Sequence, residues 1–90
     1  MLLLLGYDLN GREDPVRYRT VNEMVEAHSV SCTRPLYSTW FIETNDPVQT
    51  WHDRMRGVTD SNDRWFILPI TPPRQGFLSA SDVDWLRDRG

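Results

Sequence analysis

The chain has 90 residues, a net charge of −3 and a sequence pI near 5.2. Apolar residues make up 39% of it and charged residues 26%, which is typical of one folded domain and excludes a largely disordered chain. Every basic residue is arginine, yet the acidic balance argues against strong, sequence-independent binding to nucleic acids, which requires a basic surface.

The cysteine content and the opening residues narrow the class further. Cys32 is the single cysteine, so an intrachain disulfide and a zinc site built from several cysteines are both excluded. The leucine run at 2–5 is too short for a membrane span, lacks a preceding basic region and is soon followed by Asp8. We therefore expect a cytoplasmic protein with no signal peptide and no membrane partner.

Residues 1–10 read Met-Leu-Leu-Leu-Leu-Gly-Tyr-Asp-Leu-Asn. An unbroken apolar run that leads into turn-forming residues is typical of a strand buried on both faces. We therefore place this strand near the centre of a sheet, with its polar end emerging where the sheet meets solvent.

Two helices are predicted from matching patterns. The tripeptide Asp-Pro-Val occurs at 14–16 and again at 46–48, and each copy suits a helix start, with aspartate as N-cap and proline at the first helical position. An apolar stripe at i, i+3, i+7 and i+10 follows each copy. The first stripe, which predicts a helix over 15–28, is Tyr18, Val21, Val25 and His28; the second is Val48, Trp51, Met55 and Val58.

Three further strands are expected at 30–34, ending before Pro35, at 37–44 and at 64–70, with the last at an edge because of Pro69. The order β-α-β-β-α-β predicts an α+β, ferredoxin-like domain over residues 1–71: a four-stranded antiparallel sheet with two helices on one face and the first and third strands central. Residues 72–90 form a tail with a short helix near 82–88, which packs on this domain or on a partner subunit.

A sheet covered by helices on one face leaves the other face open. We therefore expect a homodimer formed through that face. Trp40, Trp51 and Trp65 could instead serve as stacking platforms for single-stranded bases, but packing in the core or at the dimer interface is the preferred interpretation.

Four segments together resemble a known family. They are Leu-Gly-Tyr-Asp-Leu-Asn at 5–10, Leu-Tyr-Ser-Thr-Trp-Phe-Ile at 36–42, Ser-Asn-Asp-Arg-Trp-Phe-Ile at 61–67 and Asp-Trp-Leu at 84–86. The chain resembles the SinR-like family of small bacterial and phage proteins. That family is similar to the dimeric CRISPR-associated adaptation subunit and to the VapD ribonucleases.

The resemblance implies a ferredoxin-like homodimer and a candidate site at Asp8. In the adaptation subunit, the matching aspartate is paired across the dimer axis and is proposed to hold a divalent metal for phosphodiester cleavage. A hard cation such as Mg²⁺ prefers carboxylate oxygens, so one Asp8 from each subunit could be both metal ligand and catalytic group. The alternative is that Asp8 merely caps the turn after the first strand.

Other candidate residues have structural alternatives as well. His52, beside the stripe of the second helix, is the better general-base candidate if the protein is a nuclease, but it is more simply structural. Arg12, Arg17, Arg19 and Arg34 are candidate nucleic-acid contacts. We expect Arg34 to lie near the other three if the second strand borders the first. The interleaved acidic residues favour a solvated surface of ion pairs.

Three functions remain open from the sequence. The preferred one is a homodimeric binding or scaffold module linked to RNA or DNA, without catalysis. The second is a Mg²⁺-dependent endonuclease that uses Asp8 at the dimer interface. The third is a toxin-type ribonuclease similar to VapD.

Overall fold

The structure, a computed structural model, describes residues 1–9 and 15–89 of the chain. In chain order its elements are β1 (Leu2–Asp8), α1 (Pro15–His28), β2 (Ser31–Leu36), β3 (Thr39–Glu43), α2 (Val48–Val58), β4 (Arg64–Pro69) and α3 (Ala80–Asp88). They confirm the predicted α+β class and the C-terminal helix. Within the described residues, no helix is long and apolar enough to cross a membrane.

The four strands form one antiparallel sheet in the order β2-β3-β1-β4. The central pair is β1 and β3, as their apolar runs predicted, and β4 is an edge strand. Leu3 and Leu5 are fully buried on the face that we call inner, whereas Leu2 and Leu4 alternate onto the outer face and are half-buried. The opening strand is therefore central, but only its inner face is completely closed from water.

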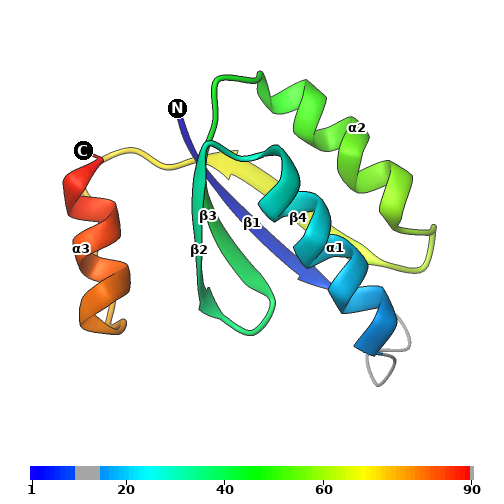
Figure 1. Ribbon diagram of the computed structural model, residues 1–90, viewed down its shortest axis with the longest axis horizontal. Coiled ribbons are helices and arrows are strands. Elements are labelled where there is room, and N and C mark those ends of the chain that lie inside the picture. Colours follow the sequence, from blue (N-terminus) through cyan, green and yellow to red (C-terminus); the bar gives the residue numbers. More distant parts are fainter. Residues whose placement is uncertain (10–14, 90) are drawn as a thin grey trace.

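Helices α1 and α2 lie side by side over the inner face of the sheet (Figure 1). Both predicted stripes form the core, and the observed bounds of α1 coincide with the predicted 15–28. His28 is the exception, because it is the last residue of α1 and stays exposed. The buried stripe residues are Tyr18, Val21 and Val25 of α1 and Trp51 and Met55 of α2.

The starts of the two helices differ from the sequence expectation. Pro15 is the first residue of α1, but its predicted N-cap Asp14 lies outside the described residues. In α2 the N-cap is Pro47 itself, with no side-chain capping bond. Asp46 instead uses its carboxylate to accept a hydrogen bond from Arg54, Nη2 to Oδ2 at 2.9 Å.

The bounds of β2 and β3, which form a hairpin, differ from the predicted bounds. β2 does not end before Pro35 but continues through it to Leu36. The strand can contain Pro35 because β2 is an edge strand and its register shifts between Thr33 and Leu36. At such a place the missing N–H of the proline interrupts no regular ladder of hydrogen bonds. β3 begins at Thr39, since residues 37 and 38 form the turn between the strands.

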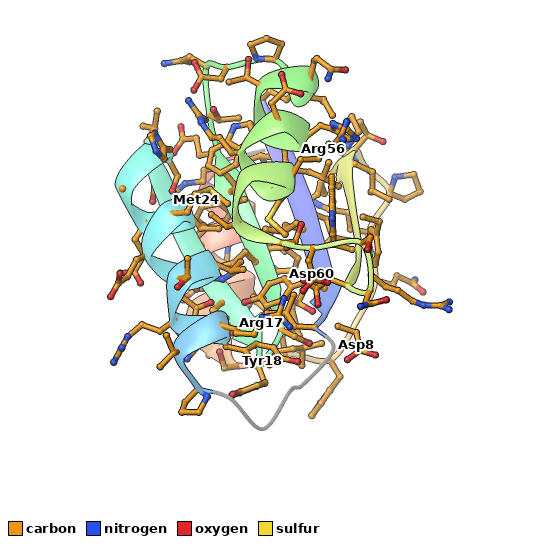
Figure 2. All side chains as sticks on the ribbon, turned by 90° about the vertical axis from the view of Figure 1, so that its right-hand side faces the viewer. Asp8, Arg17, Tyr18, Met24, Arg56 and Asp60 are labelled. Atoms are coloured by element: carbon orange, nitrogen blue, oxygen red, sulfur yellow. The ribbon has the colours of Figure 1, made fainter. Side chains whose placement is uncertain are left out.

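Helix α3 packs on the outer face, on the opposite side of the sheet from α1 and α2 (Figures 1 and 2). The Trp85 ring stacks on Phe41, with centroids 6.5 Å apart, and its Nε1 donates to Ser31 Oγ at 3.0 Å. Arg89 Nε donates to Glu43 Oε1 at 3.0 Å. These contacts fix α3 over β2 and β3 and leave the β1–β4 half of the outer face open.

Helix α3 starts two residues before the predicted segment. Its N-cap is Ser79, whose Oγ accepts from the backbone N–H of Asp82 at 3.3 Å. Asp82 is itself buried, and its carboxylate Oδ1 accepts a hydrogen bond from Thr33 Oγ1 at 2.6 Å. The cap therefore also ties the start of α3 to β2.

Gly6 allows a close approach on the open half of the outer face. The Phe66 ring of β4 lies over this glycine, and a Cβ atom built at Gly6 would be 2.6 Å from Phe66 Cζ. Phe66 can therefore lie flat across β1 only because residue 6 has no side chain.

Thr44 closes the other end of the core. Its Oγ1 accepts from Trp51 Nε1 at 2.9 Å and from the backbone N–H of Asp46 at 3.0 Å, and both Thr44 and Trp51 are fully buried. The hydroxyl thus satisfies the indole of the largest core side chain and shapes the approach to α2.

We predict that Thr44→Val lowers the free energy of unfolding by about 1–3 kcal/mol, because it leaves the buried Trp51 N–H without an acceptor while keeping the side-chain volume. Urea denaturation checks this. Thr44→Ser is the matched control, since it keeps the hydroxyl oxygen. A valine variant with the midpoint of the native chain would show that the hydrogen bond contributes nothing.

Candidate functional site

An open cleft lies where α1 meets the β2–β3 hairpin, with a volume of about 600 Å³. One wall is a stripe of α1 residues spaced three or four apart, which places them on one face of the helix. The other wall and the floor come from the hairpin. The lining residues used below are Tyr18, Asn22, Glu23 and Glu26 of α1, with Arg34, Tyr37 and Trp40.

A hydrogen-bonded triad of Tyr7, Asn22 and Trp40 supports the floor of the cleft. The Tyr7 hydroxyl donates to Asn22 Oδ1 at 2.7 Å and accepts from Trp40 Nε1 at 3.2 Å. Trp40 Nε1 also lies 3.1 Å from Asn22 Oδ1. Because Oδ1 receives both donors, the amide of Asn22 is held in one orientation.

Aromatic rings continue from this floor to the rim. Tyr7 and Tyr18 have ring centroids 5.8 Å apart, and Tyr18 and Tyr37 are 5.2 Å apart. The Arg34 guanidinium lies 5.9 Å from the Tyr37 ring centroid and 5.8 Å from that of Trp40. A cation over two ring faces is held by their quadrupoles without needing a carboxylate partner.

Burial raises the pKa of the Tyr7 phenol above its ordinary value of 10.0, and the Trp40 hydrogen bond and the Arg34 charge oppose this shift in part. The phenol therefore stays protonated throughout the physiological range. It can act as the fixed donor that orients Asn22.

The structure places Asp8 and His52 on different sides of the sheet. Asp8 is exposed at the end of β1, on the outer face, opposite Arg64 of β4. His52 belongs to α2 over the inner face, with its ring 5.1 Å from that of Trp65. Its Nδ1 is shielded from water, 3.6 Å from Asp53 Oδ1, and forms no hydrogen bond in the described part of the chain. The two residues do not share one site within a subunit.

The four candidate arginines divide into separate settings. Arg12 lies outside the described residues. Arg17 forms ion pairs with Asp60, at 3.4 Å, and with Asp63, which dock the turn before β4 onto α1; Figure 2 shows Arg17 and Asp60 at the same end of the molecule as Asp8. Of the three arginines that lie in the described part of the chain, Arg19 and Arg34 line the same cleft.

Arg34 was expected near the other arginines on the condition that the second strand borders the first, and this condition is wrong. β2 does not border β1, since β3 lies between them. Arg34 approaches α1 because the end of β2 packs against that helix. Arg19 faces it across the cleft and has Glu23 at 3.9 Å as an exposed neighbour one helical turn away.

The described residues contain no group of three or more histidine, cysteine or acidic side chains placed to hold a metal ion. A Mg²⁺ site at Asp8 would therefore need ligands from a second subunit, from solvent or from a substrate.

A second, larger hollow lies on the outer face between β1, β4, the segment after β4 and α3, with a volume of about 1410 Å³. We call it the apolar groove. Its floor is Leu4, Phe41 and Phe66, and Val83 and Leu86 of α3 form one side. Phe66 is 51% exposed and Leu68, beside Leu4 in the sheet register, is 43% exposed, so water contacts much apolar surface here.

Sequence analysis missed Asn22 and Tyr37. Asn22 lies between buried stripe residues of α1. A polar residue at the border of an apolar helix stripe is the sequence signal that could have indicated its role. Tyr37 was assigned to a strand, but it lies in the hairpin turn and is 65% exposed. An aromatic residue in a turn is a sign of a contact surface.

Comparison with known families and with characterised proteins gives no match: no family model and no curated protein sequence is significantly similar to this chain.

We predict that the free energy of unfolding falls as the pH rises above 10, because the unfolded phenol of Tyr7 loses its proton at a lower pH than the folded one. The stability that comes from the raised pKa of Tyr7 is fully present below pH 10. It is lost as the pH rises from 10 to the pKa of Tyr7 in the folded state. Denaturant titrations at several alkaline pH values measure the slope.

In the control variant Tyr7→Phe, this part of the slope should be absent, and the free energy of unfolding at neutral pH should fall by about 1 kcal/mol because a hydrogen bond is lost. The same alkaline slope in both proteins would refute the assignment to Tyr7.

Proposed function

We propose that this chain is a SinR-like, ferredoxin-like protein that works as a homodimeric binding or scaffold module linked to nucleic acid. The element order β-α-β-β-α-β, followed by α3, and the strand order β2-β3-β1-β4 support the ferredoxin-like arrangement. The motif resemblance at 5–10, 36–42, 61–67 and 84–86 supports the family and its link to nucleic acid.

The apolar groove is the observation that carries the homodimer. Monomeric proteins rarely leave a continuous apolar face open. Here Phe66 and Val83 line one hollow, and the exposed Leu68 lies beside Leu4 on the same face of the sheet. A two-fold axis over the groove would pack this surface against its own copy, which is the commonest arrangement of homodimers.

The cleft supports the link to nucleic acid. Arg19 and Arg34, two of the predicted contacts, line it together with an exposed tyrosine. Guanidinium groups bind phosphates and base edges, and exposed aromatic rings stack on unpaired bases. The cleft lies between α1 and the hairpin, whereas the groove lies across the sheet, so dimerisation through the groove would leave the cleft accessible.

We predict that light scattering gives the mass of a dimer for the native chain and that Phe66→Glu shifts it to a monomer, because two carboxylates would be buried in an apolar interface. The matched control is Val30→Glu, which places the same charge on another exposed apolar residue, outside the groove. A monomeric native chain, or a dimer that survives Phe66→Glu, would contradict an interface at the groove.

A Mg²⁺-dependent endonuclease is the second candidate, favoured by the position of Asp8. Asp8 is exposed on the same face of the sheet as the groove. A dimer formed through that face would bring both Asp8 carboxylates to the interface, where one carboxylate from each subunit could bind the cation.

If the endonuclease hypothesis is right, Asp8→Asn should abolish Mg²⁺-dependent cleavage of labelled RNA or DNA, because a neutral amide binds the cation far more weakly than a carboxylate. The dimer mass should be unchanged, since Asp8→Asn keeps the size of the side chain and removes a repulsion between two carboxylates. His52→Ala tests the general-base assignment in the same assay. Cleavage that survives Asp8→Asn, or a native dimer that cuts neither substrate, would rule out this candidate.

A further inference from the structure

The cleft between α1 and the hairpin presents hydrogen-bonding groups that the described part of the chain leaves unpaired. Arg34 forms no ion pair there; its guanidinium contacts only the rings of Tyr37 and Trp40, so its N–H donors remain available. Asn22 uses Oδ1 for two protein donors, which leaves its Nδ2 hydrogens as a fixed donor pair. Both groups can therefore donate to a ligand.

Acceptors and an open ring complete the set. Glu23 and Glu26, exposed on α1, line the cleft opposite the hairpin and supply carboxylate oxygens. The Tyr37 ring is 65% exposed and is backed by Tyr18, so a planar ligand can stack on it at little conformational cost. The volume of about 600 Å³ lies within the range of small-molecule sites.

We propose that this cleft binds the guanine ring, either of a free nucleotide or of an unpaired base in a single strand. This inference rests on the nucleic-acid link of the proposed function and names its ligand. Guanine carries acceptors, O6 and N7, on one edge, which match Arg34, and N–H donors on its Watson–Crick edge, which match the glutamates. Stacking on Tyr37 holds the ring between the two walls.

The same geometry rejects adenine. Adenine is read by an amide that offers one donor and one acceptor. Among the described residues that line the cleft, the one side-chain amide is that of Asn22, and its acceptor is already occupied by Tyr7 and Trp40. On its Watson–Crick edge adenine offers the carboxylates one donor, the N6 amino group, and turns the N1 acceptor toward them, whereas guanine offers both N1–H and N2–H2, so adenine forms fewer hydrogen bonds there.

Charge decides how the ligand is held. The chain is acidic, and the two glutamates in the cleft repel phosphates, so affinity must come from the base rather than from the backbone. With about one phosphate contact, at Arg19, raising the salt from about 50 to 200 mM should weaken single-strand binding only about threefold.

The test titrates the native protein, in whichever oligomeric state it adopts, with GMP, with AMP and with short oligouridines that carry one central guanine or adenine. Binding is measured by calorimetry and fluorescence anisotropy. We expect the guanine probes to bind at least about tenfold more tightly than the adenine probes. Binding of GMP alone would identify a free nucleotide as the ligand; binding of the guanine strand alone would identify an unpaired base.

Three variants link the binding to the cleft. Tyr37→Ala should weaken guanine binding about tenfold through loss of stacking, whereas Phe77→Ala, at another exposed aromatic residue outside the cleft, should not. Glu23→Gln combined with Glu26→Gln should reduce the preference for guanine over adenine, because each amide replaces one acceptor oxygen by a donor. All four residues are exposed, so folding should be preserved.

Equal binding of guanine and adenine strands, or guanine binding unchanged by Tyr37→Ala, would overturn the guanine site and leave the nucleic-acid link standing. Failure of every probe to bind would overturn both. The homodimer is judged separately by mass, so its outcome cannot be confused with either result.

Discussion

Strand β1 is hydrogen-bonded to β3 on one side and to β4 on the other, and this double pairing is the constraint on which the molecule depends. With both edges used, β1 can contribute only through its two faces. The inner face supplies Leu3 and Leu5 to a closed core, because α1 and α2 cover it. The outer face supplies Leu4 and Gly6 to a surface that α3 covers only over β2 and β3. The apolar groove is the part of the outer face that α3 leaves uncovered.

The cleft has a different origin, since it forms at the border of the core. Tyr7 is the last inner-face residue of β1, and its hydroxyl donates to Asn22 in the middle of α1. The buried ring contributes to the core, while the phenol organises polar groups next to water. One side chain thus joins the hydrophobic interior to the polar cleft. The hairpin extends beyond this point and adds Arg34 and Tyr37, which the core does not need.

The sequence predicted those features that local chemistry determines. The bounds of α1 followed from Pro15 and a regular apolar stripe, and the central place of β1 followed from an unbroken leucine run. The end of β2 was predicted wrongly, because whether a strand tolerates Pro35 depends on its edge position, which only the assembled sheet defines. The partners of Asn22 come from β1 and β3, far away in sequence, so no local pattern announced the triad. The sequence placed Asp8 at the end of its strand. It did not show that Asp8 and His52 lie on opposite sides of the sheet, because that depends on which face each element covers.

The arginines explain why an acidic chain presents so little basic surface. Asp60 and Asp63 neutralise Arg17, and Asp46 and Glu43 lie 2.9 and 3.0 Å from Arg54 and Arg89. These pairs are partly buried, and besides tying elements together they reduce the electric field around the protein. Because paired guanidinium groups attract phosphates weakly, long-range attraction of nucleic acid is small. Under the proposed function, recognition would therefore depend on contacts at short range, where aromatic rings and hydrogen-bond geometry select the ligand. A cationic group stacked on rings, as Arg34 is, keeps its N–H donors open to such a ligand.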